Sequence, residues 1–223
     1  MLIDYSDVEV CQGKQQILGD VNFSINEGEF VYITGKVGTG KSSLLKTIYG
    51  EVPLDKGKAT VMDMNLIKCK KKKLPELRRK MGIIFQDFQL LTDRTVYSNL
   101  DFVLKATGWK IKSEREARIA QVLNRVGMKD KGDKLPSELS GGEQQRIAIA
   151  RSILNHPALV LADEPTGNLD SETSAQITEL LHNLVDEKGA TVIMITHNTQ
   201  LIEQYPGRIF ECVDGKFQEV KNA

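Results

Sequence analysis

GKVGTGKS, residues 35–42, follows the apolar run FVYIT and leads directly into the helical run SSLLKTIYG. The eight residues satisfy the pattern GxxxxGK[ST] of a phosphate-binding loop. The glycines let backbone N–H groups turn toward phosphate oxygens, and the N-terminus of the following helix adds positive potential. Lys41 can reach the β- and γ-phosphates of a nucleotide, and the Ser42 hydroxyl can ligate Mg²⁺. A plain glycine turn is the alternative, but the pattern arises by chance in roughly 1% of chains this long, so a nucleotide-binding loop is favoured.

A second apolar run ends in two carboxylates. ALVLA, residues 158–162, runs directly into Asp163 and Glu164. Asp163 is placed to hold Mg²⁺, directly or through water, and Glu164 to polarise an attacking water. Two acids at the start of a surface loop would be the simpler interpretation of this segment alone. Beside a phosphate-binding loop, the catalytic interpretation is favoured.

Two further apolar runs also end in polar candidates. GIIF ends at Gln86, and TVIMIT ends at His197. In a parallel sheet, ligands bind in the crevice outside the carboxyl ends of the strands. Singly, Gln86 could be a solvated amide and His197 a surface imidazole. Together with the glycine loop and the two carboxylates, they predict one site at one sheet edge.

The alternation of short apolar runs with longer amphipathic stretches predicts an α/β fold with a helical insert. Short β-like runs at 21–25 and 58–62 occupy the first third of the chain, and a helical period follows over 95–126. The uniformly apolar runs later in the chain fit parallel strands that are covered on both faces. Between them, an amphipathic helix ends at Gly189, and Asp214-Gly215 indicates a hairpin turn near the end.

LSGGEQQR, residues 139–146, opens another helix. Ser140 and Glu143 are spaced as a capping box, which explains both residues without a ligand. A capping box does not explain Gly141 and Gly142, because glycines weaken the first turn of a helix. Two glycines at a helix N-terminus instead indicate close approach of an anion. The chain thus has a complete phosphate-binding loop and, separately, a second helix N-terminus suited to an anion. This combination suggests that two copies of the chain pair, with the helix N-terminus of one copy at the phosphate loop of the other.

Composition narrows the class of protein. The 223 residues carry 30 Lys+Arg and 30 Asp+Glu, with 40% hydrophobic residues. This composition excludes long disorder, and the balanced charge argues against a dedicated nucleic-acid binder. Three separated cysteines indicate neither a disulfide framework nor a zinc site. The sequence has no signal peptide and no apolar run near the ~18 residues of a membrane helix, so we expect a soluble, cytosolic chain that reaches a membrane through a partner.

GKVGTGKSS, LSGGEQQR, LADEPTGNLD and MITHN, with Gln86 between them, resemble in order and spacing the ATP-binding subunits of ABC systems. The resemblance spans most of the chain. It implies an α/β P-loop NTPase fold, with a RecA-like core, an antiparallel β subdomain and an ABC helical subdomain. Residues 1–223 would form a single nucleotide-binding domain, with the helical subdomain inserted at about 87–157.

The resemblance also assigns roles to residues. The signature residues of one subunit would face the γ-phosphate on the other subunit's phosphate loop, so that a head-to-tail homodimer encloses two ATP molecules. Glu164 would be the general base, His197 the γ-phosphate switch, and Gln86 the link between Mg²⁺ and the membrane partner. The predicted Mg²⁺ ligands are Ser42, Gln86 and Asp163. The predicted nucleotide-binding residues are Gly35, Lys36, Val37, Gly38, Thr39, Gly40, Lys41, Ser42, Ser43, Ser140, Gly141, Gly142 and Asp170.

A narrower resemblance concerns the branch of the family. LADEPTGNLD is similar to the branch that includes lipoprotein-release, macrolide-export and cell-division ATPases, and residues 83–100 resemble the FtsE family of cell-division ATP-binding proteins. That family pairs with the integral membrane protein FtsX at the cytoplasmic side of the inner membrane. Its ATP cycle is thought to send a conformational signal that activates cell-wall hydrolases at the septum. The segment after Gln86 would then contact the partner.

Three alternatives stay open at this point. The chain could serve a lipoprotein-release or efflux transporter, or it could be a nucleotide-gated binding switch with negligible hydrolysis. Glu164 and His197 argue against the switch. A DNA-repair or translation ATPase is disfavoured because such proteins carry coiled-coil inserts or two cassettes, and this chain has neither the length nor a basic excess.

The sequence departs from the family in one respect. Members usually stack the adenine on an aromatic residue in the first strand region, where this chain has Val10 or Cys11, and Tyr5 lies too early. Weaker stacking, by ~1 kcal/mol, would raise the ATP dissociation constant several-fold. Among the remaining features, the aromatic residues Trp109, Phe85, Phe88 and Phe102 are expected to pack the helical subdomain.

The basic block at 68–80 is expected to be a solvated helix face. The less favoured alternative is attraction to anionic lipids of the cytoplasmic leaflet, at ~1 kcal/mol per charge.

Overall fold

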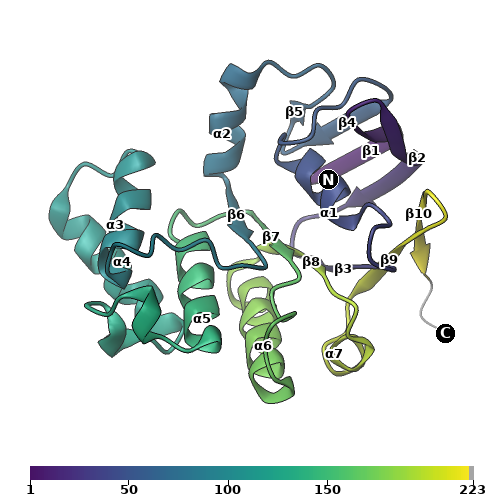
Figure 1. Ribbon diagram of the computed structural model, residues 1–223. Coiled ribbons are helices and arrows are strands. Elements are labelled where there is room, and N and C mark those ends of the chain that lie inside the picture. Colours follow the sequence, from purple (N-terminus) through teal and green to yellow (C-terminus); the bar gives the residue numbers. More distant parts are fainter. Residues whose placement is uncertain (221–223) are drawn as a thin grey trace.

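The computed structural model describes residues 1–220, apart from the side chains at positions 187 and 188. A main sheet of largely parallel strands forms the centre of the fold (Figure 1). β10 pairs antiparallel with β9, and the other neighbouring strands pair in parallel. In spatial order the strands are β10 (Lys216–Val220), β9 (Arg208–Val213), β3 (Phe30–Thr34), β8 (Thr191–Ile195), β7 (Leu159–Asp163) and β6 (Met81–Ile84).

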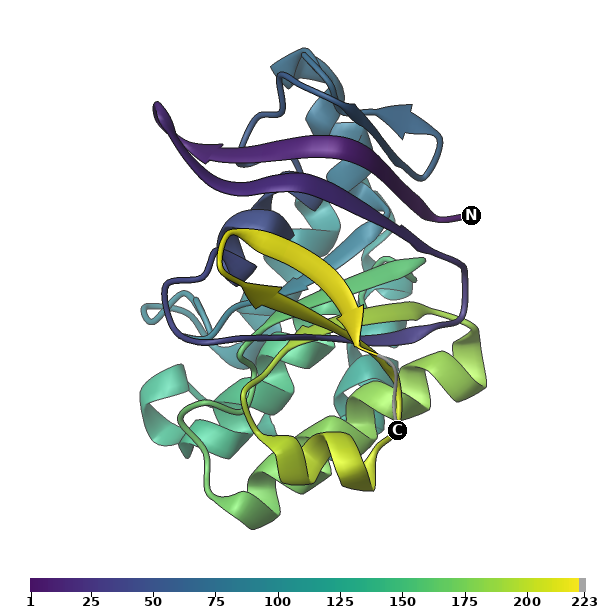
Figure 2. The same cartoon turned by 90° about the vertical axis from the view of Figure 1, so that its right-hand side faces the viewer.

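A smaller antiparallel sheet lies beside the main one. Its spatial order is β2 (Gln15–Ile25), β1 (Ile3–Gln12), β4 (Lys58–Val61) and β5 (Met64–Asn65). Figure 2 shows α1 between the two sheets, with α6 and α7 on the opposite side of the main sheet. The α helices are α1 (Lys41–Ile48), α2 (Leu74–Arg79), α3 (Val96–Ala106), α4 (Lys112–Arg125), α5 (Gly141–Ser152), α6 (Ser171–Lys188) and α7 (Thr199–Gln204).

The central strands divide their side chains between two hydrophobic cores. On β3, Val31 and Ile33 pack with α1 and the antiparallel sheet, whereas Phe30 and Tyr32 pack with α6 on the other face. Because alternate side chains of a strand point to opposite faces, a strand covered on both sides must be apolar at every position. β7 and β8 divide in the same way, with Leu161 and Ile193 in the first core and Val160 and Val192 in the second, so the expectation drawn from the uniformly apolar runs is confirmed.

The chain between β6 and β7 carries α3, α4 and α5, which lie to the left of the sheet in Figure 1. Ile119, Val122 and Leu123 form the apolar face of α4 and are buried in the same core as residues of α5. The helical period noted over 95–126 is split into two helices, and Gly108, with a φ of 101°, lies in the break. The exact bounds of the helical subdomain, 87–157, stay a prediction.

The helix end and the hairpin turn predicted near the C-terminus are both present. α6 ends at Gly189, which has a φ of 62°, and Asp214 and Gly215 form the tight turn between β9 and β10 with φ values of 48° and 75°.

None of the helices within residues 1–220 combines the length and the apolar character that a bilayer span requires.

One expectation about packing is wrong. Phe102 is 49% exposed, whereas Trp109 packs partly buried and donates a hydrogen bond from Nε1 to Asn155 Oδ1 at 3.0 Å. α3 buries Val96, Leu100 and Leu104, which recur at the spacing of one helix face. Phe102 lies two residues away from that series, so it points outward.

Candidate functional site

The glycine loop connects β3 to α1 at the carboxyl end of the main sheet. Residues 36–38 are exposed, and Thr39 Oγ1 donates to the Lys36 carbonyl at 2.8 Å. Gly40, the N-cap of α1, has a φ of 98°, and a Cβ there would lie 2.6 Å from Ile17 Cγ2. A side chain at position 40 would therefore meet both backbone strain and a clash with β2.

Lys41 lies inside the loop. The residue is only 5% exposed, and its Nζ donates hydrogen bonds to the carbonyls of Gly35 at 2.8 Å and Lys36 at 2.9 Å. A buried ammonium needs hydrogen-bond acceptors, and the loop carbonyls supply them. The positive charge of Lys41 is thus held at the centre of the predicted phosphate cradle. Ser42 and Ser43 follow on the first turn of α1, both half-buried.

Ser42 and Asp163 meet across the sheet. Ser42 Oγ donates to Asp163 Oδ1 at 2.9 Å, which joins α1 to the end of β7. Burial raises the pKa of the Asp163 carboxyl above its ordinary value, the Ser42 hydrogen bond opposes that rise, and the nearby Glu164 adds to it. A buried carboxyl of raised pKa gains from a cation at the same place, because the cation favours its charged form.

A hydroxyl and a carboxylate are the hard oxygen donors that suit Mg²⁺, which protein sites hold through one or two carboxylates together with substrate phosphates. No group of three or more His, Cys, Asp or Glu within the described part of the chain could hold a metal ion by itself. The pair Ser42 and Asp163 therefore fits a Mg²⁺ bound jointly with a nucleotide.

Glu164 has an unusual backbone. Its φ is 46°, in the left-handed region that non-glycine residues rarely occupy and that costs on the order of 1–3 kcal/mol. Glu164 Oε2 lies 3.8 Å from Nδ1 of His197, whose side chain is 69% exposed. Both residues line one small hollow at the ends of β7 and β8. Backbone strain of this kind collects at functional sites, and here it sets the direction of a carboxylate.

Gln86 lies on the other side of the same edge. It is exposed, and it lines a hollow with Asp163 and Asn168. A Cβ at Gly167 would lie 3.5 Å both from Gln86 Nε2 and from Glu164 Oε2, so these two side chains approach the same point. The exposed loop residue Lys36 shares a further hollow, of about 860 Å³, with His197. The structure thus brings Gln86, the two carboxylates, His197 and the glycine loop to one edge.

The signature tip lies apart from this edge. Ser140 and Gly141 are exposed at the start of α5, and Figure 1 shows α5 separated from α1. The expected capping box is present, with Ser140 N donating to Glu143 Oε2 at 2.9 Å and Glu143 N donating to Ser140 Oγ at 3.3 Å. Nothing in the described chain covers the tip, so it is free to meet a second copy.

One reason for the two glycines lies within the monomer. A Cβ on Gly142 would lie 2.6 Å from Thr173 Cγ2 on α6, whereas a Cβ on Gly141 would meet ordinary contacts at 3.6 Å or more. Packing against α6 therefore explains Gly142 without an anion. The anion interpretation of the sequence rests on Gly141 and on the exposed position of the tip.

Asp170 has a structural role of its own. It is the N-cap of α6 and accepts hydrogen bonds from Thr173 N at 2.9 Å and from Thr173 Oγ1 at 2.7 Å. The Thr173 backbone N–H lowers the pKa of its carboxyl. Its predicted contact with a second subunit stays a prediction, and the cap accounts for the residue in the monomer.

The first strand has no exposed aromatic residue near the position where family members stack the adenine. Tyr5 is buried, and its hydroxyl shares a hydrogen bond of 3.0 Å with Thr47 Oγ1 on α1. Val10 is also buried, and Cys11 is partly exposed. Tyr5 therefore belongs to the core between the two sheets and cannot stack on a base.

Comparison with known proteins identifies the family. The sequence profile described as ABC transporter matches residues 18–167. The chain belongs to the ABC transporter family. Solved ABC structures agree: a dimeric post-hydrolysis state of the ATP-binding cassette MJ0796 bound to ADP and Pi superposes with a TM-score of 0.86 at 32% identity, covering 99% of this chain and all of that one. A P-loop fold of the ABC type, as the sequence predicted, is confirmed.

Curated relatives within the family carry a cell-division name. The chain is 44% identical to the cell division ATP-binding protein FtsE of Streptococcus pneumoniae over 199 residues, 89% of this chain and 86% of the relative. It is 42% identical to the FtsE proteins of Bacillus subtilis, with the same shares, and of Escherichia coli, over 91% and 90% of the two chains. The predicted resemblance to ABC subunits of this kind is confirmed.

Sequence reasoning missed one residue of the ABC signature. Gln145 is 0% exposed, and among the described residues neither Oε1 nor Nε2 has a hydrogen-bond partner. Gln145 lies one turn after Gly141, on the same face of α5. At Gly141 this face is directed toward Leu169 and Phe88, which lie in the loops that follow Glu164 and Gln86. A buried polar residue cannot be recognised in a signature where its neighbours Glu143 and Gln144 are also polar.

We expect Gln145→Leu to raise the free energy of unfolding by about 1–3 kcal/mol, because it removes two unpaired buried polar atoms at nearly constant volume. Urea unfolding of the two proteins measures the difference. Gln144→Leu is the matched control, since Gln144 Nε2 donates to the Leu139 carbonyl at 3.2 Å and its loss lowers stability by about 0.5–1.5 kcal/mol. A Gln145 variant destabilised as much as the Gln144 variant would contradict the assignment.

Proposed function

We propose that this chain is the ATP-binding and ATP-hydrolysing subunit of an FtsE–FtsX-like complex. In this proposal, ATP-driven homodimerisation transmits a conformational signal through an integral membrane partner to control septal cell-wall hydrolysis. The observation that carries the enzymatic part is the hydrogen bond between Ser42 and Asp163 beside Glu164. It supports a site in which phosphate, cation and general base would lie at one edge of the sheet. The FtsE-named relatives support the cell-division part.

The proposed chemistry uses side chains already in place. Lys41 and the N–H groups of the loop would bind the phosphates of ATP. Ser42 and Asp163, with Gln86 nearby, would hold Mg²⁺, which when bound would offset the charge of the transferred phosphoryl group. Glu164 would accept a proton from the attacking water while the water oxygen bonds to the γ-phosphorus and the bond from that phosphorus to the leaving oxygen of ADP breaks, so that ADP and phosphate leave. His197, 3.8 Å from Glu164, would contact the γ-phosphate.

A second copy would complete the site. The exposed tip of α5 carries N–H groups at Gly141 and Gly142 that point out of the helix end, but it does not line the hollows of its own glycine loop. A head-to-tail dimer would bring each tip to the other subunit's loop, and such an isologous pair forms two equivalent sites. The dimeric state of the MJ0796 cassette supports this arrangement.

The segment after Gln86 would contact the membrane partner. It leads to a hollow of about 460 Å³ at the start of α3, lined by Phe102, Leu135 and Arg94. Phe102 and Leu135 are among the exposed large hydrophobic residues, and the Arg94 guanidinium lies 5.1 Å from the Phe102 ring centroid. An exposed aromatic residue beside a hollow is the kind of anchor point that protein interfaces use. The partner would thus hold the protein at the cytoplasmic face of the inner membrane.

Co-purification tests this part of the proposal. With the membrane proteins solubilised in mild detergent, the tagged chain is expected to bring down an FtsX-like protein. We expect Phe102→Asp to reduce that recovery at least ~10-fold, because it replaces a hot-spot aromatic worth about 2 kcal/mol or more with a charge.

Ile111→Asp is the matched control, because Ile111 is 55% exposed but does not line the hollow. Basal ATP hydrolysis by both variants should equal that of the unmodified chain. Recovery of a transporter with a large periplasmic domain would favour the lipoprotein-release or efflux alternative. Equal loss in both variants would show that the hollow is not the contact.

A further inference from the structure

The segment Lys68–Lys80, here called the basic segment, concentrates positive charge in an otherwise neutral protein. It contains eight Lys and Arg residues and one acid, Glu76, whereas the rest of the chain carries seven more acidic than basic side chains. The segment forms the 3₁₀ turn η1 (Lys71–Lys73) and α2, which extends from the top of the molecule in Figure 1. Charge is therefore segregated at one end of the fold.

The backbone of the basic segment is firmly held. Leu74 and Leu77 are buried, and the Arg78 guanidinium donates to the carbonyls of Tyr49 at 2.9 Å and Gly50 at 3.3 Å at the end of α1. These contacts fix α2 against α1, so the charged side chains project from a rigid support. Arg78 is engaged in this packing, and the other seven cations are available for a partner.

Those seven cations are exposed and lack counterions. Within residues 1–220, no carboxylate lies within ion-pair distance of Lys68, Arg79, Lys80 or the four lysines at 70–73. An ordinary solvated helix face interleaves the two signs, as α4 does with Lys112 and Glu116 at 3.5 Å. The basic segment instead keeps like charges together, which is unfavourable unless an anionic surface meets them.

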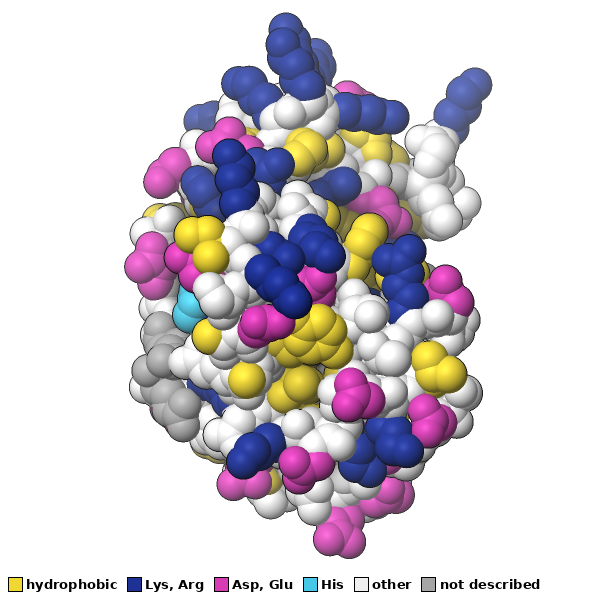
Figure 3. All heavy atoms as spheres, turned by 90° about the vertical axis from the view of Figure 1, so that its left-hand side faces the viewer, with side chains coloured by type: hydrophobic (Ala, Val, Ile, Leu, Met, Phe, Trp, Pro, Cys, Tyr) yellow, Lys and Arg dark blue, Asp and Glu magenta, His cyan; other side chains and the backbone are white. Residues whose placement is uncertain are grey.

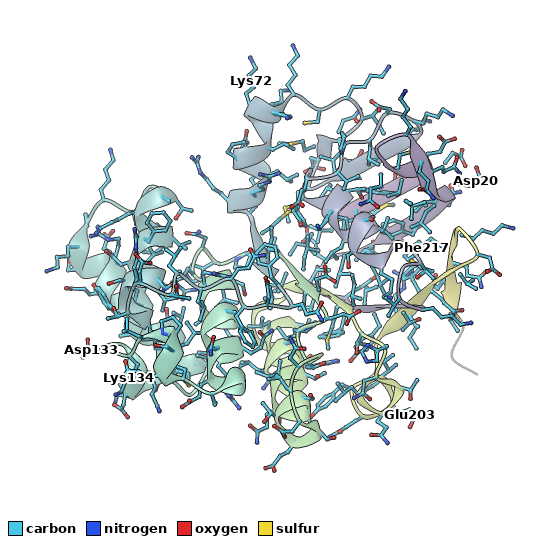
Figure 4. All side chains as sticks on the ribbon, viewed as in Figure 1. Asp20, Lys72, Asp133, Lys134, Glu203 and Phe217 are labelled. Carbon is cyan, nitrogen blue, oxygen red and sulfur yellow. The ribbon has the colours of Figure 1, made fainter. Side chains whose placement is uncertain are left out.

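The arrangement fits an extended surface better than a single phosphate. Three consecutive lysines form the 3₁₀ turn, with Lys70 as its N-cap, so their side chains point in different directions. Lysines also act as point charges rather than as paired donors. Figure 4 shows Lys72 directed away from the protein, and Figure 3 shows Lys and Arg side chains gathered at this end of the face that α3 and α4 present. The basic segment and the side that carries the α3 hollow are thus accessible from one direction.

We propose that the basic segment binds directly to an anionic lipid bilayer, through Lys70, Lys71, Lys72, Lys73 and Arg79. Clusters of four to eight cations gain about 1 kcal/mol for each charge near such a surface. The protein would then bind the membrane electrostatically through its own side chains, in addition to any contact with a membrane partner. This contact needs neither ATP nor the residues of the proposed ATPase site, so it goes beyond the proposed function.

Vesicle sedimentation with the full chain tests the proposal. The chain is expected to bind vesicles containing phosphatidylglycerol, to ignore vesicles of pure phosphatidylcholine, and to detach as salt rises, because the Debye length shortens from about 30 Å at 0.01 M to about 3 Å at 1 M. Substituting glutamine for Lys70, Lys71, Lys72 and Lys73 together should weaken binding at least ~10-fold.

The matched control removes the same charge elsewhere, with Lys14, Lys58, Lys110 and Lys129 changed to glutamine, since all four are exposed and unpaired with acids within the described chain. It should retain binding, and both variants should hydrolyse ATP like the unmodified chain. No binding to anionic vesicles at low salt, or equal loss in both variants, would overturn the proposal. Binding to an acidic polypeptide or to nucleic acid without binding to the vesicles would also overturn it.

Discussion

Glu164→Gln is expected to lower ATP turnover by about 10²–10⁴-fold, the range that a positioned general base contributes. The amide has nearly the shape of the carboxylate, so the backbone at φ 46° and the packing at the end of β7 should persist. What is lost is the ability to accept a proton from water. ATP binding, which depends on Lys41 and the glycine loop, should be retained.

The same variant is expected to accumulate as an ATP-bound dimer, because the step that would separate the subunits no longer occurs. Phosphate release measures turnover, and size-exclusion chromatography with and without ATP measures the dimer. Glu203→Gln is the control, since Glu203 lines a hollow with His197 but lies on α7, away from the carboxylate pair. Full hydrolysis by the Glu164 variant would remove this residue as the base.

The positions of the site residues could be predicted because each follows the end of an apolar strand. Gln86, the adjacent carboxylates Asp163 and Glu164, and His197 are separated from one another by tens of residues. Only the rule that the carboxyl ends of parallel strands share one edge of the sheet predicts that they lie together. The Ser42–Asp163 hydrogen bond and the Glu164–His197 approach agree with that rule. These residues could be assigned to one site without knowing the order of the strands in the sheet, because in a parallel sheet the carboxyl ends of all strands lie at the same edge.

The first strand could not be predicted from its pattern. β1 buries Ile3 and Tyr5 and then Val8 and Val10, so the period of two shifts by one residue. The register with β2 shifts between Tyr5 and Val8, and Asp7 has a φ of 53° at this irregularity. A bulge of this kind inserts one residue and breaks the alternation on which a strand assignment depends. The contact of Gly142 with Thr173 was also invisible, because it depends on how α5 packs against α6.

The second prediction of large effect concerns the two-subunit site. Lys41→Met and Ser140→Arg are each expected to lower turnover at least ~10²-fold when assayed alone, because one removes the charge in the phosphate cradle and the other blocks the signature tip. Mixing the two variants should restore activity. In a head-to-tail dimer of one variant with the other, both defects fall on one site and leave the second site intact.

At equal concentrations about half of the dimers are mixed, so about one quarter of all sites should hydrolyse ATP. The rate of phosphate release per total subunit at saturating ATP, relative to the unmodified chain, measures this fraction if the two sites of a dimer act independently. The control pair combines Lys41→Met with Glu164→Gln: there the intact loop has no base, and the intact base has no loop lysine, so mixing should restore nothing. Recovery in the first pair and none in the second follows only if the glycine loop and Glu164 act from the same chain while the tip of α5 acts from the other. Full activity of Ser140→Arg alone, with its exposed tip blocked, would show instead that the site is complete within one subunit.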